Sequence, residues 1–267
     1  MPESEPSATS ARFAVSDIHG HPEEFRSALQ RKHLVDASGR WTGGTAQLCC
    51  LGDYFDRGTD GIAVIELLIR LQQEAADAGG SVTALLGNHE VLALGMHRFG
   101  RQSIATAHGP RSFEASWTRN QGQASDQARL TDQHLDWLQR LPAMAKSGSD
   151  ILLHSDISGY QEWGRDPHQV NAQVGVRLRS ASAETLWGLW SDLTRRRQFR
   201  GPAGSRTANG FLAHFDGDRI VHGHSVIGEA DGRPAMQNTR AESYAGGRVL
   251  AIDAGLSAGG PCLIVEL

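Results

Sequence analysis

The run Gly-Asp-Tyr-Phe-Asp-Arg-Gly at residues 52–58 constrains the fold of this chain most, because it directly follows the apolar stretch 46–51. Asp53, Asp56 and Arg57 thus lie at the end of what the apolar pattern predicts to be a buried strand. A carboxylate left alone at the tip of a core strand loses roughly several kcal/mol of hydration. We therefore expect a cation, hydrogen-bond donors or a metal ion beside these aspartates.

Two further apolar stretches end in polar blocks of the same kind. Residues 12–16 lead into Asp-Ile-His-Gly at 17–20, and residues 82–86 lead into Gly-Asn-His-Glu at 87–90. Ligands of open parallel α/β sheets bind outside the carboxyl ends of the strands, so the three blocks would converge in such a sheet. Their carboxylate, amide and imidazole groups suit divalent metal ions.

In order and type, these blocks resemble the motifs of metal-dependent phosphoesterases of the calcineurin-like superfamily, and particularly of its phosphoprotein-phosphatase branch. The motifs extend over about residues 12–265, and the run 34–44 is similar to that of bacterial Shewanella-like phosphatases. The resemblance implies an α/β fold, a four-layer α/β/β/α sandwich with a dinuclear metal site at the carboxyl ends of the strands. It implies one such domain over residues 12–267.

The resemblance also implies the metal ligands. Asp53 is expected to bridge two divalent ions, Mn2+ in the first place with Fe, Zn, Ni or Co as alternatives, because ions about 3.5–4 Å apart need a shared ligand. A lone histidine after an apolar run is usually a core residue, and His222 is expected at a strand end. Val226 stands where many phosphodiesterases of the superfamily have another histidine, which favours the phosphatase branch. The expected ligands are Asp17, His19, Asp53, Asn88, His154 and His224.

The same resemblance assigns the catalytic groups. A hydroxide between the two ions would attack phosphorus in line, and His89 would protonate the departing alkoxide. Asp56 would orient the His89 imidazole, and Arg57 and Asn88 would hold the phosphate. Alternatively, Asp56 and Arg57 form a local salt bridge worth ~0–1 kcal/mol if exposed. Glu90 is expected to be a structural residue at a helix start.

Three positions depart from the family pattern or stay open. Related enzymes carry a second phosphate-binding arginine as Trp-x-Arg, whereas residues 190–192 here are Trp-Ser-Asp. Arg196, in a run of arginines that follows, is our candidate substitute, although such a run is usually a solvated helix face. Asp156 either supports the ligands or shapes the substrate pocket, and Asp253 either supports a histidine or forms a turn before glycine.

Periodicity predicts the remaining elements. Helices are expected over 22–33, from 62 to near 79–80, over 130–141 and over 170–200, with Trp187 and Trp190 as core anchors. A strand is expected at 150–153, and the apolar runs 219–221, 249–252 and 262–265 are expected in the second sheet. The segment 95–123 lacks a clear stripe, so we interpret it as a mobile or substrate-facing insertion.

Composition excludes several classes of protein. The 267 residues contain 39% hydrophobic and 21% charged residues with a net charge of −4, which is typical of a soluble domain and disfavours nucleic acid as the main partner. No apolar run approaches a membrane span, and residues 1–11 are expected to be a disordered tail and not a signal peptide. Cys49, Cys50 and Cys262 are expected to be buried free thiols of a cytoplasmic protein, so a cysteine-nucleophile phosphatase is disfavoured.

The leading hypothesis is thus a phosphomonoesterase acting on phosphoserine or phosphothreonine in proteins or on small phosphate esters. The second is a symmetrical dinucleoside tetraphosphate hydrolase, since such enzymes share the blocks. A phosphate-binding protein without activity is the third, and it is disfavoured because all expected ligands and the acid are present. The sequence leaves the oligomeric state open.

Overall fold

The first sheet carries the three strand ends. The computed structural model describes residues 10–267, so nearly all of the expected tail 1–11 lies outside the described residues. Parallel β1 (Arg12–Val15), β2 (Gln47–Cys50) and β3 (Ser81–Ala84) match the predicted strands, and β9 (Val265–Glu266) pairs antiparallel with β1. The order is β3-β2-β1-β9. The parallel register pairs Val15 with Cys50 and Cys50 with Ala84, which brings all three polar blocks to one edge.

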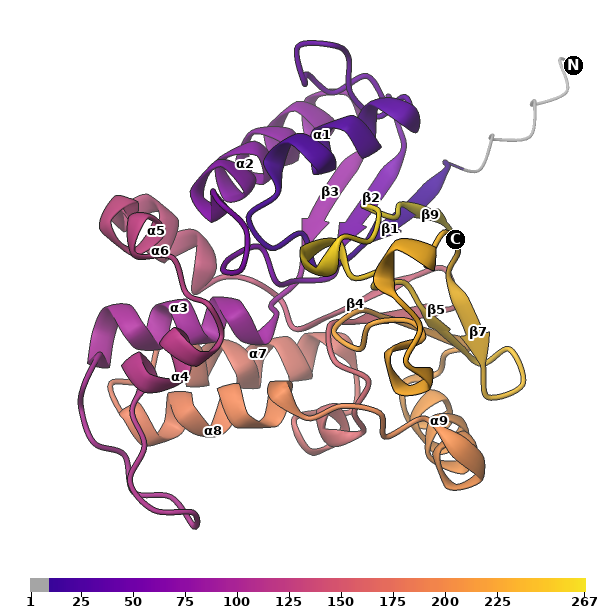
Figure 1. Cartoon of the computed structure of the whole chain (residues 1–267). Coiled ribbons are helices and arrows are strands. Elements are labelled where there is room, and N and C mark those ends of the chain that lie inside the picture. Colours follow the sequence, from indigo (N-terminus) through magenta and orange to yellow (C-terminus); the bar gives the residue numbers. More distant parts are fainter. Residues whose placement is uncertain (1–9) are drawn as a thin grey trace, which may run out of the picture.

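Two helices cover the outer face of this sheet (Figure 1). Helix α1 (Pro22–Arg31) begins with a proline, and α2 (Gly61–Asp77) is capped by Asp60, whose carboxylate accepts from Ala63 N at 2.8 Å. Both helices bury an apolar stripe, as their periodicity predicts. They are the right-handed crossovers that a parallel sheet requires.

The second sheet contains the later strands in the order β4-β5-β6-β8-β7. Helices α7 (Pro167–Leu178) and α9 (Gly201–Phe215) pack against β4 and β6. The central pair, β5 and β6, is parallel, with Leu153 opposite His222, so a second pair of strand ends reaches the same region. Its strands are β4 (Met144–Ser147), β5 (Asp150–Leu153), β6 (Arg219–His222), β7 (Glu242–Tyr244) and β8 (Val249–Ala251).

A layer of apolar side chains joins the two sheets. Ala14 and Cys49 from the first sheet pack with Leu152 and Val221 from the second. Strand neighbours such as Cys50 point to the opposite face and join the larger core under the helices. The four layers, helices, sheet, sheet and helices, are those expected from the sequence.

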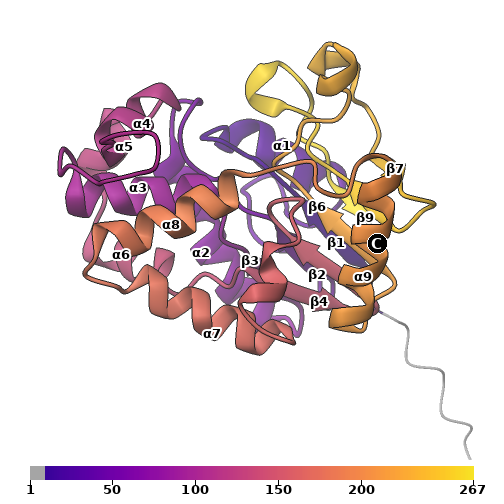
Figure 2. The same ribbon diagram turned by 90° about the horizontal axis from the view of Figure 1, so that it is seen from below.

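The remaining helices gather at one side of the molecule (Figure 2). Helix α3 follows β3 directly, packs along α8, and contacts α4 so closely that a Cβ on Gly95 would lie 2.2 Å from the Phe113 ring. The α-helices of this group are α3 (Asn88–Phe99), α4 (Phe113–Arg119), α5 (Ala124–Arg129), α6 (Asp132–Leu138) and α8 (Ala183–Thr194). Short 3-10 turns are η1 (Gly159–Glu162), η2 (Glu229–Asp231), η3 (Ala235–Gln237) and η4 (Leu256–Ala258).

The expected helical region 170–200 is divided between α7 and α8, with Trp187 and Trp190 partly buried against the core. The segment 95–123 contains the end of α3 and the whole of α4, joined by the loop 100–112, and its orientation towards substrate stays a prediction. One expectation about elements was wrong. The run 262–265 leads into β9 of the first sheet, not the second. Helix α9 was missed because Gly201, Gly204 and Gly210 obscure its periodicity. No helix within residues 10–267 combines the length and apolar character that crossing a membrane requires.

Candidate metal centre

All six expected ligands lie together at the carboxyl ends of β1, β2, β5 and β6 and at the start of α3. Each is almost fully buried, and the most exposed, His224, retains 5% of its accessible surface. The described residues contain two groups able to hold a metal ion, one with His19, Asp53 and His89 and one with Asp53, His154 and His224. Asp53 is common to both. The structure therefore brings the predicted residues together, while their roles as ligands stay a prediction.

Asp53 lies between the two groups with one oxygen facing each. Its Oδ2 is 3.7 Å from His19 Nε2, and its Oδ1 is 3.3 Å from His154 Nε2. Burial raises the pKa of the Asp53 carboxyl well above its usual value, and the negative charge of Asp17 raises it further. A carboxylate in this position needs positive charge on both sides, which two cations would provide.

The position between Asp17, His19 and Asp53 fits a cation because the His19 lone pair that faces it has no other partner among the described residues. His19 Nδ1 donates to the Phe55 carbonyl at 2.8 Å, which leaves Nε2 as an acceptor. This Nε2 is buried and has no hydrogen-bond partner among the described residues, and it lies 3.8 Å from Asp17 Oδ1. Asp17 Oδ2, in contrast, accepts from the His224 backbone at 2.8 Å. Three acceptor atoms of Asp17, His19 and Asp53 thus converge.

In the second group, two acceptor atoms face one another. His154 Nδ1 donates to the Leu51 carbonyl at 2.9 Å, so its Nε2 is also an acceptor, and it faces the carboxamide oxygen of Asn88 at 3.0 Å. Two facing lone pairs repel unless a cation lies beside them. His224 Nε2 donates to the Thr194 carbonyl at 3.1 Å, which leaves its Nδ1 for a metal. The donor set fits a divalent ion at this position as well.

His89 forms a different kind of contact. Its Nδ1 donates to Asp56 Oδ2 at 2.6 Å, and Arg57 Nη2 donates to its Nε2 at 3.2 Å. Both nitrogens are therefore engaged, which argues against the alternative that His89 is a ligand of the first ion. Among the described residues Asp56 pairs with His89 and not with Arg57, so a simple local salt bridge does not describe the pair.

Burial opposes charge on both members of the His89–Asp56 pair. It lowers the pKa of His89 well below its usual value, and the Arg57 guanidinium lowers it further. Burial raises the pKa of the Asp56 carboxyl to about 7, although Arg57 and hydrogen bonds from Trp117 and the Gln123 backbone act in the opposite direction. The imidazole is thus held with its Nδ1–H directed at Asp56 and the lone pair of its Nε2 directed at Arg57.

The arginines after α8 differ in how firmly they are held. Arg197 pairs with Glu229 at 2.6 Å, and Arg195 pairs with Asp192 at 2.6 Å. Arg196 reaches Glu229 only at 4.0 Å, with its side chain 36% exposed. Its positive charge lowers the pKa of His89, His154 and His224, although burial is the larger cause at each. These contacts favour Arg196 within the run.

The backbone of the site is strained, and no sequence signal predicted this. Positive φ angles between 46° and 66° occur at six of the candidate residues, although only glycine adopts them without cost. Paired main chains hold the first two loops in this state: His19 N donates to Asp53 O at 2.9 Å and Gly20 N to Tyr54 O at 2.8 Å. The six residues are Asp17, His19, Asp53, Asp56, Arg57 and His224.

Glu90 and Gly223 allow the loops that carry the candidate ligands to approach one another. The Glu90 carboxylate accepts from the backbone of Asp53, Tyr54 and Gly87 at 2.7–2.8 Å, which is the structural role expected for it. A Cβ on Gly223 would lie 2.3 Å from Asp17 Oδ2, so any side chain there would displace a candidate ligand.

Two carboxylates whose roles were open now have partners. Asp253 Oδ1 accepts from Gly255 N at 2.8 Å, so it forms the turn before glycine. Asp156 Oδ1 accepts from Ser225 Oγ at 2.7 Å, directly after His224, while its Oδ2 is buried without a partner among the described residues. His222 lies at the strand end as expected, bonded through Nε2 to the Tyr244 hydroxyl at 2.8 Å. The contacts of Ser225, Trp117 and Tyr244 were not foreseen, since nothing in the sequence marks these residues.

Comparison with known proteins places this geometry in a family. A model of the calcineurin-like phosphoesterases matches residues 13–228. The chain is 39% identical over 79 residues to Shewanella-like protein phosphatase 2 of Arabidopsis thaliana, a match that covers 30% of this chain and only 20% of that protein. It is 25% identical over 227 residues to an asymmetrical bis(5'-nucleosyl)-tetraphosphatase of Anoxybacillus flavithermus, covering 80% of this chain and 78% of that protein.

A solved structure shares the fold over nearly the whole chain. The cold-active protein tyrosine phosphatase of a psychrophilic Shewanella species superimposes with a TM-score of 0.72 over 97% of this chain and 76% of that chain, at 22% sequence identity.

Proposed function

Because the chain belongs to the calcineurin-like phosphoesterase family and is therefore a hydrolase of phosphoesters, we propose that it removes phosphate from phosphoserine and phosphothreonine in proteins. The likeness to Shewanella-like protein phosphatases supports protein substrates. The Shewanella structure is described as a tyrosine phosphatase, so phosphotyrosine is the alternative to be tested against this proposal.

The position of Asp53 is the observation that best supports hydrolysis at a two-metal site. One oxygen of this carboxylate faces the group of His19, and the other faces the group of His154, at 3.7 and 3.3 Å. A single bridging carboxylate between two sets of acceptors is what a two-metal hydrolytic site requires. The His89–Asp56 pair and Arg57 border it directly.

The proposed roles follow from these contacts. Asp17, His19 and Asp53 would hold one ion, and Asp53, Asn88, His154 and His224 would hold the other. Two bound divalent ions would supply acidification of the attacking water and neutralisation of the phosphate charge.

The chain's own side chains would perform the rest of the reaction. Arg57 offers a planar guanidinium to two phosphate oxygens, assisted by Asn88 and, across the site, by Arg196. When the phosphate replaces His89 as the partner of Arg57, the Nε2 lone pair becomes free to take up a proton from water, and the resulting imidazolium can give that proton to the leaving oxygen. Asp56 keeps the ring in place through Nδ1 and stabilises the protonated form.

Dinucleoside tetraphosphates are the second candidate substrate. The relative from Anoxybacillus flavithermus matches most of both chains, and the metal centre would serve phosphoanhydrides equally well. The products distinguish the two modes of cleavage: hydrolysis of diadenosine tetraphosphate in the middle gives two ADP, whereas asymmetrical hydrolysis gives ATP and AMP. A small-molecule phosphatase would instead accept aryl phosphates and discriminate little among peptides.

The decisive experiment compares kcat/KM for matched phosphoserine, phosphothreonine and phosphotyrosine peptides, an aryl phosphate and diadenosine tetraphosphate, each with Mn2+. We expect the phosphoserine and phosphothreonine peptides to be preferred, and the Asp53→Asn variant to be inactive on all substrates. Preference for phosphotyrosine or for the dinucleotide would overturn the substrate assignment and leave the metal chemistry intact. Absence of turnover on every substrate, with two ions bound, would contradict the proposed function itself.

A further inference from the structure

Positive charge is concentrated in the segment 95–123 that borders the candidate centre. The chain as a whole has a net charge of −4, but this segment contains the four arginines 98, 101, 111 and 119 and a single acidic residue, Glu114. Segregated charge of one sign on an exposed surface attracts partners of the opposite sign.

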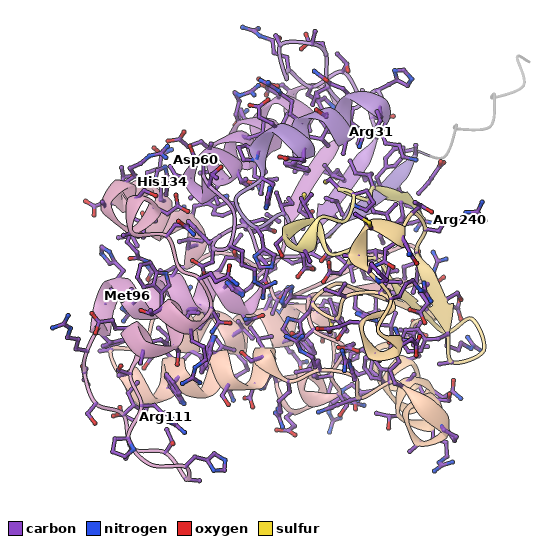
Figure 3. The ribbon with its side chains drawn as sticks, in the orientation of Figure 1. Arg31, Asp60, Met96, Arg111, His134 and Arg240 are labelled. Carbon is purple, nitrogen blue, oxygen red and sulfur yellow. The ribbon has the colours of Figure 1, made fainter. Side chains whose placement is uncertain are left out.

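Three of these arginines surround one hollow. Arg101, Arg111 and Arg119 line a depression of about 260 Å³ between α4 and the loop before it, together with the serines at 103, 112 and 116. We call the three arginines and this depression the basic surface. Figure 3 labels Arg111 beside α4, at the outer side of the molecule.

The guanidinium groups of the basic surface are largely available. Arg101 binds Glu114 through Nε at 2.8–2.9 Å, and its two terminal nitrogens have no hydrogen-bond partner within residues 10–267. Arg111 and Arg119 are exposed, and neither forms an ion pair with another described residue. In contrast, Arg195, Arg197 and Arg200, which follow α8 in the chain, each have an acidic partner at 2.6 Å.

The basic surface is connected to the catalytic loop through the end of α4. Gln121, two residues after Arg119, accepts a hydrogen bond from Arg57 N at 3.0 Å. From the same stretch, Trp117 and the Gln123 backbone hydrogen-bond to Asp56. Helix α4 is only about 10 Å long, a distance that about three residues of an extended peptide span.

We propose that the basic surface binds acidic residues flanking the phosphorylated residue of a protein substrate, an inference that rests on the proposed phosphatase function. Bidentate carboxylate binding by arginine supplies the recognition, assisted by serine hydroxyls. The lining contains no aromatic ring on which an adenine could stack, which favours a peptide over a dinucleotide as the occupant.

The test uses a double variant, Arg111→Ala with Arg119→Ala, and two phosphopeptides that differ only in flanking Asp and Glu against Ala and Gln. A matched control, Arg165→Ala with Arg206→Ala, removes the same charge from exposed arginines before α7 and on α9 that form no ion pair with described residues. The readout is the ratio of kcat/KM for the acidic peptide to that for the neutral peptide, so that a general loss of activity cancels.

We expect the wild-type ratio to exceed one and to fall about three- to tenfold in the double variant but not in the control. Raising NaCl from about 0.05 to 0.5 M should lower the wild-type ratio as well, because exposed charges are screened. Equal kcat/KM for the two peptides in the wild type, or an equal loss in the control, would overturn the inference while leaving the phosphatase function standing. If neither peptide is hydrolysed but an aryl phosphate or dinucleotide is, the proposed function fails together with it.

Discussion

At the scale of single residues, the sequence predicted which side chains meet but not how the backbone presents them. Asp17, His19 and Asp53 were expected at strand ends, and they are there, yet each has a φ in the left-handed region. Such a conformation costs on the order of 1–3 kcal/mol at a non-glycine residue and persists only where surrounding contacts impose it. Those contacts come from a neighbouring loop distant in sequence, which no local pattern reveals.

The role of His89 can be separated from metal binding by two substitutions. His89→Ala removes the proposed acid but none of the proposed ligand atoms, so kcat should fall about 10²–10⁴-fold while two ions per chain remain bound. Asp53→Asn should lose both metal and activity, because one oxygen and the bridging charge are gone. Activity assays with metal analysis by mass spectrometry check both. His97→Ala, exposed on the same helix, serves as the control. Equal metal loss in the two site variants would refute the assignment of His89 as the acid.

The cysteines provide a test of burial at the same scale. Burial raises the pKa of Cys262 to about 12 and shifts the pKa of Cys49 and Cys50 in the same direction. The native protein should therefore resist alkylation by iodoacetamide at about pH 8, where a free thiol of ordinary pKa reacts. Unfolded in urea, all three thiols should react, as counted by intact mass. Rapid native alkylation without loss of structure would show that the thiols are accessible.

At the scale of elements, the sequence predicted the helices and strands that carry a clear apolar pattern and missed those that carry none. The strands β1, β2, β3 and β5 end in polar blocks and the helices α1 and α2 carry clear stripes, so they were found. Helix α3 is buried on every side over residues 88–95, which removes any stripe, and α4 has seven residues, too few for a period. β9 has two residues, and its sheet is decided by pairing with β1 at the other end of the chain.

The anchoring of α4 on α3 predicts a large effect of one substitution. The Phe113 side chain is fully buried, 5.3 Å from the Trp187 ring and 6.0 Å from the Phe99 ring between centroids. Phe113→Ala should lower the free energy of unfolding by about 3–5 kcal/mol through lost burial and a cavity. Urea unfolding at constant m-value measures this. Val176→Ala, which truncates a side chain 63% exposed on α7, should change it by less than about 0.5 kcal/mol. A similar effect of the two changes would mean that α4 is not anchored through Phe113.

At the scale of the whole molecule, residues far apart in the chain together complete the candidate metal site. The ligands near residues 17, 53 and 88 follow one another in three strand-end blocks, so their convergence could be argued from a parallel sheet. His154 and His224 could not be distinguished in that way from the other ten histidines, because a lone histidine after an apolar run looks like a core residue. They were selected by the family resemblance, and only the packing of the two sheets brings them beside Asp53.

This arrangement predicts that metal stabilises the entire fold. The acceptors of His19, His154 and Asp53 lie between the strand ends of the two sheets, and Nε2 of His19 has no hydrogen-bond partner among the described residues, so the metal-free protein carries an uncompensated buried lone pair there. Ions that bind only the folded state at about 100 times their dissociation constant add about 2.7 kcal/mol. For a domain of this size that corresponds to a rise in Tm of about 5–10 °C. Protein stripped with EDTA and titrated with Mn2+ in a calorimeter should show this rise, reversed by renewed chelation.

The Asp53→Asn variant should show no such rise in Tm, whereas Asp132→Asn, at the exposed start of α6, should retain it. An equal rise in Tm for both variants would place the stabilising ions elsewhere on the protein, because Asp53 is the one carboxylate common to the two candidate groups among the described residues.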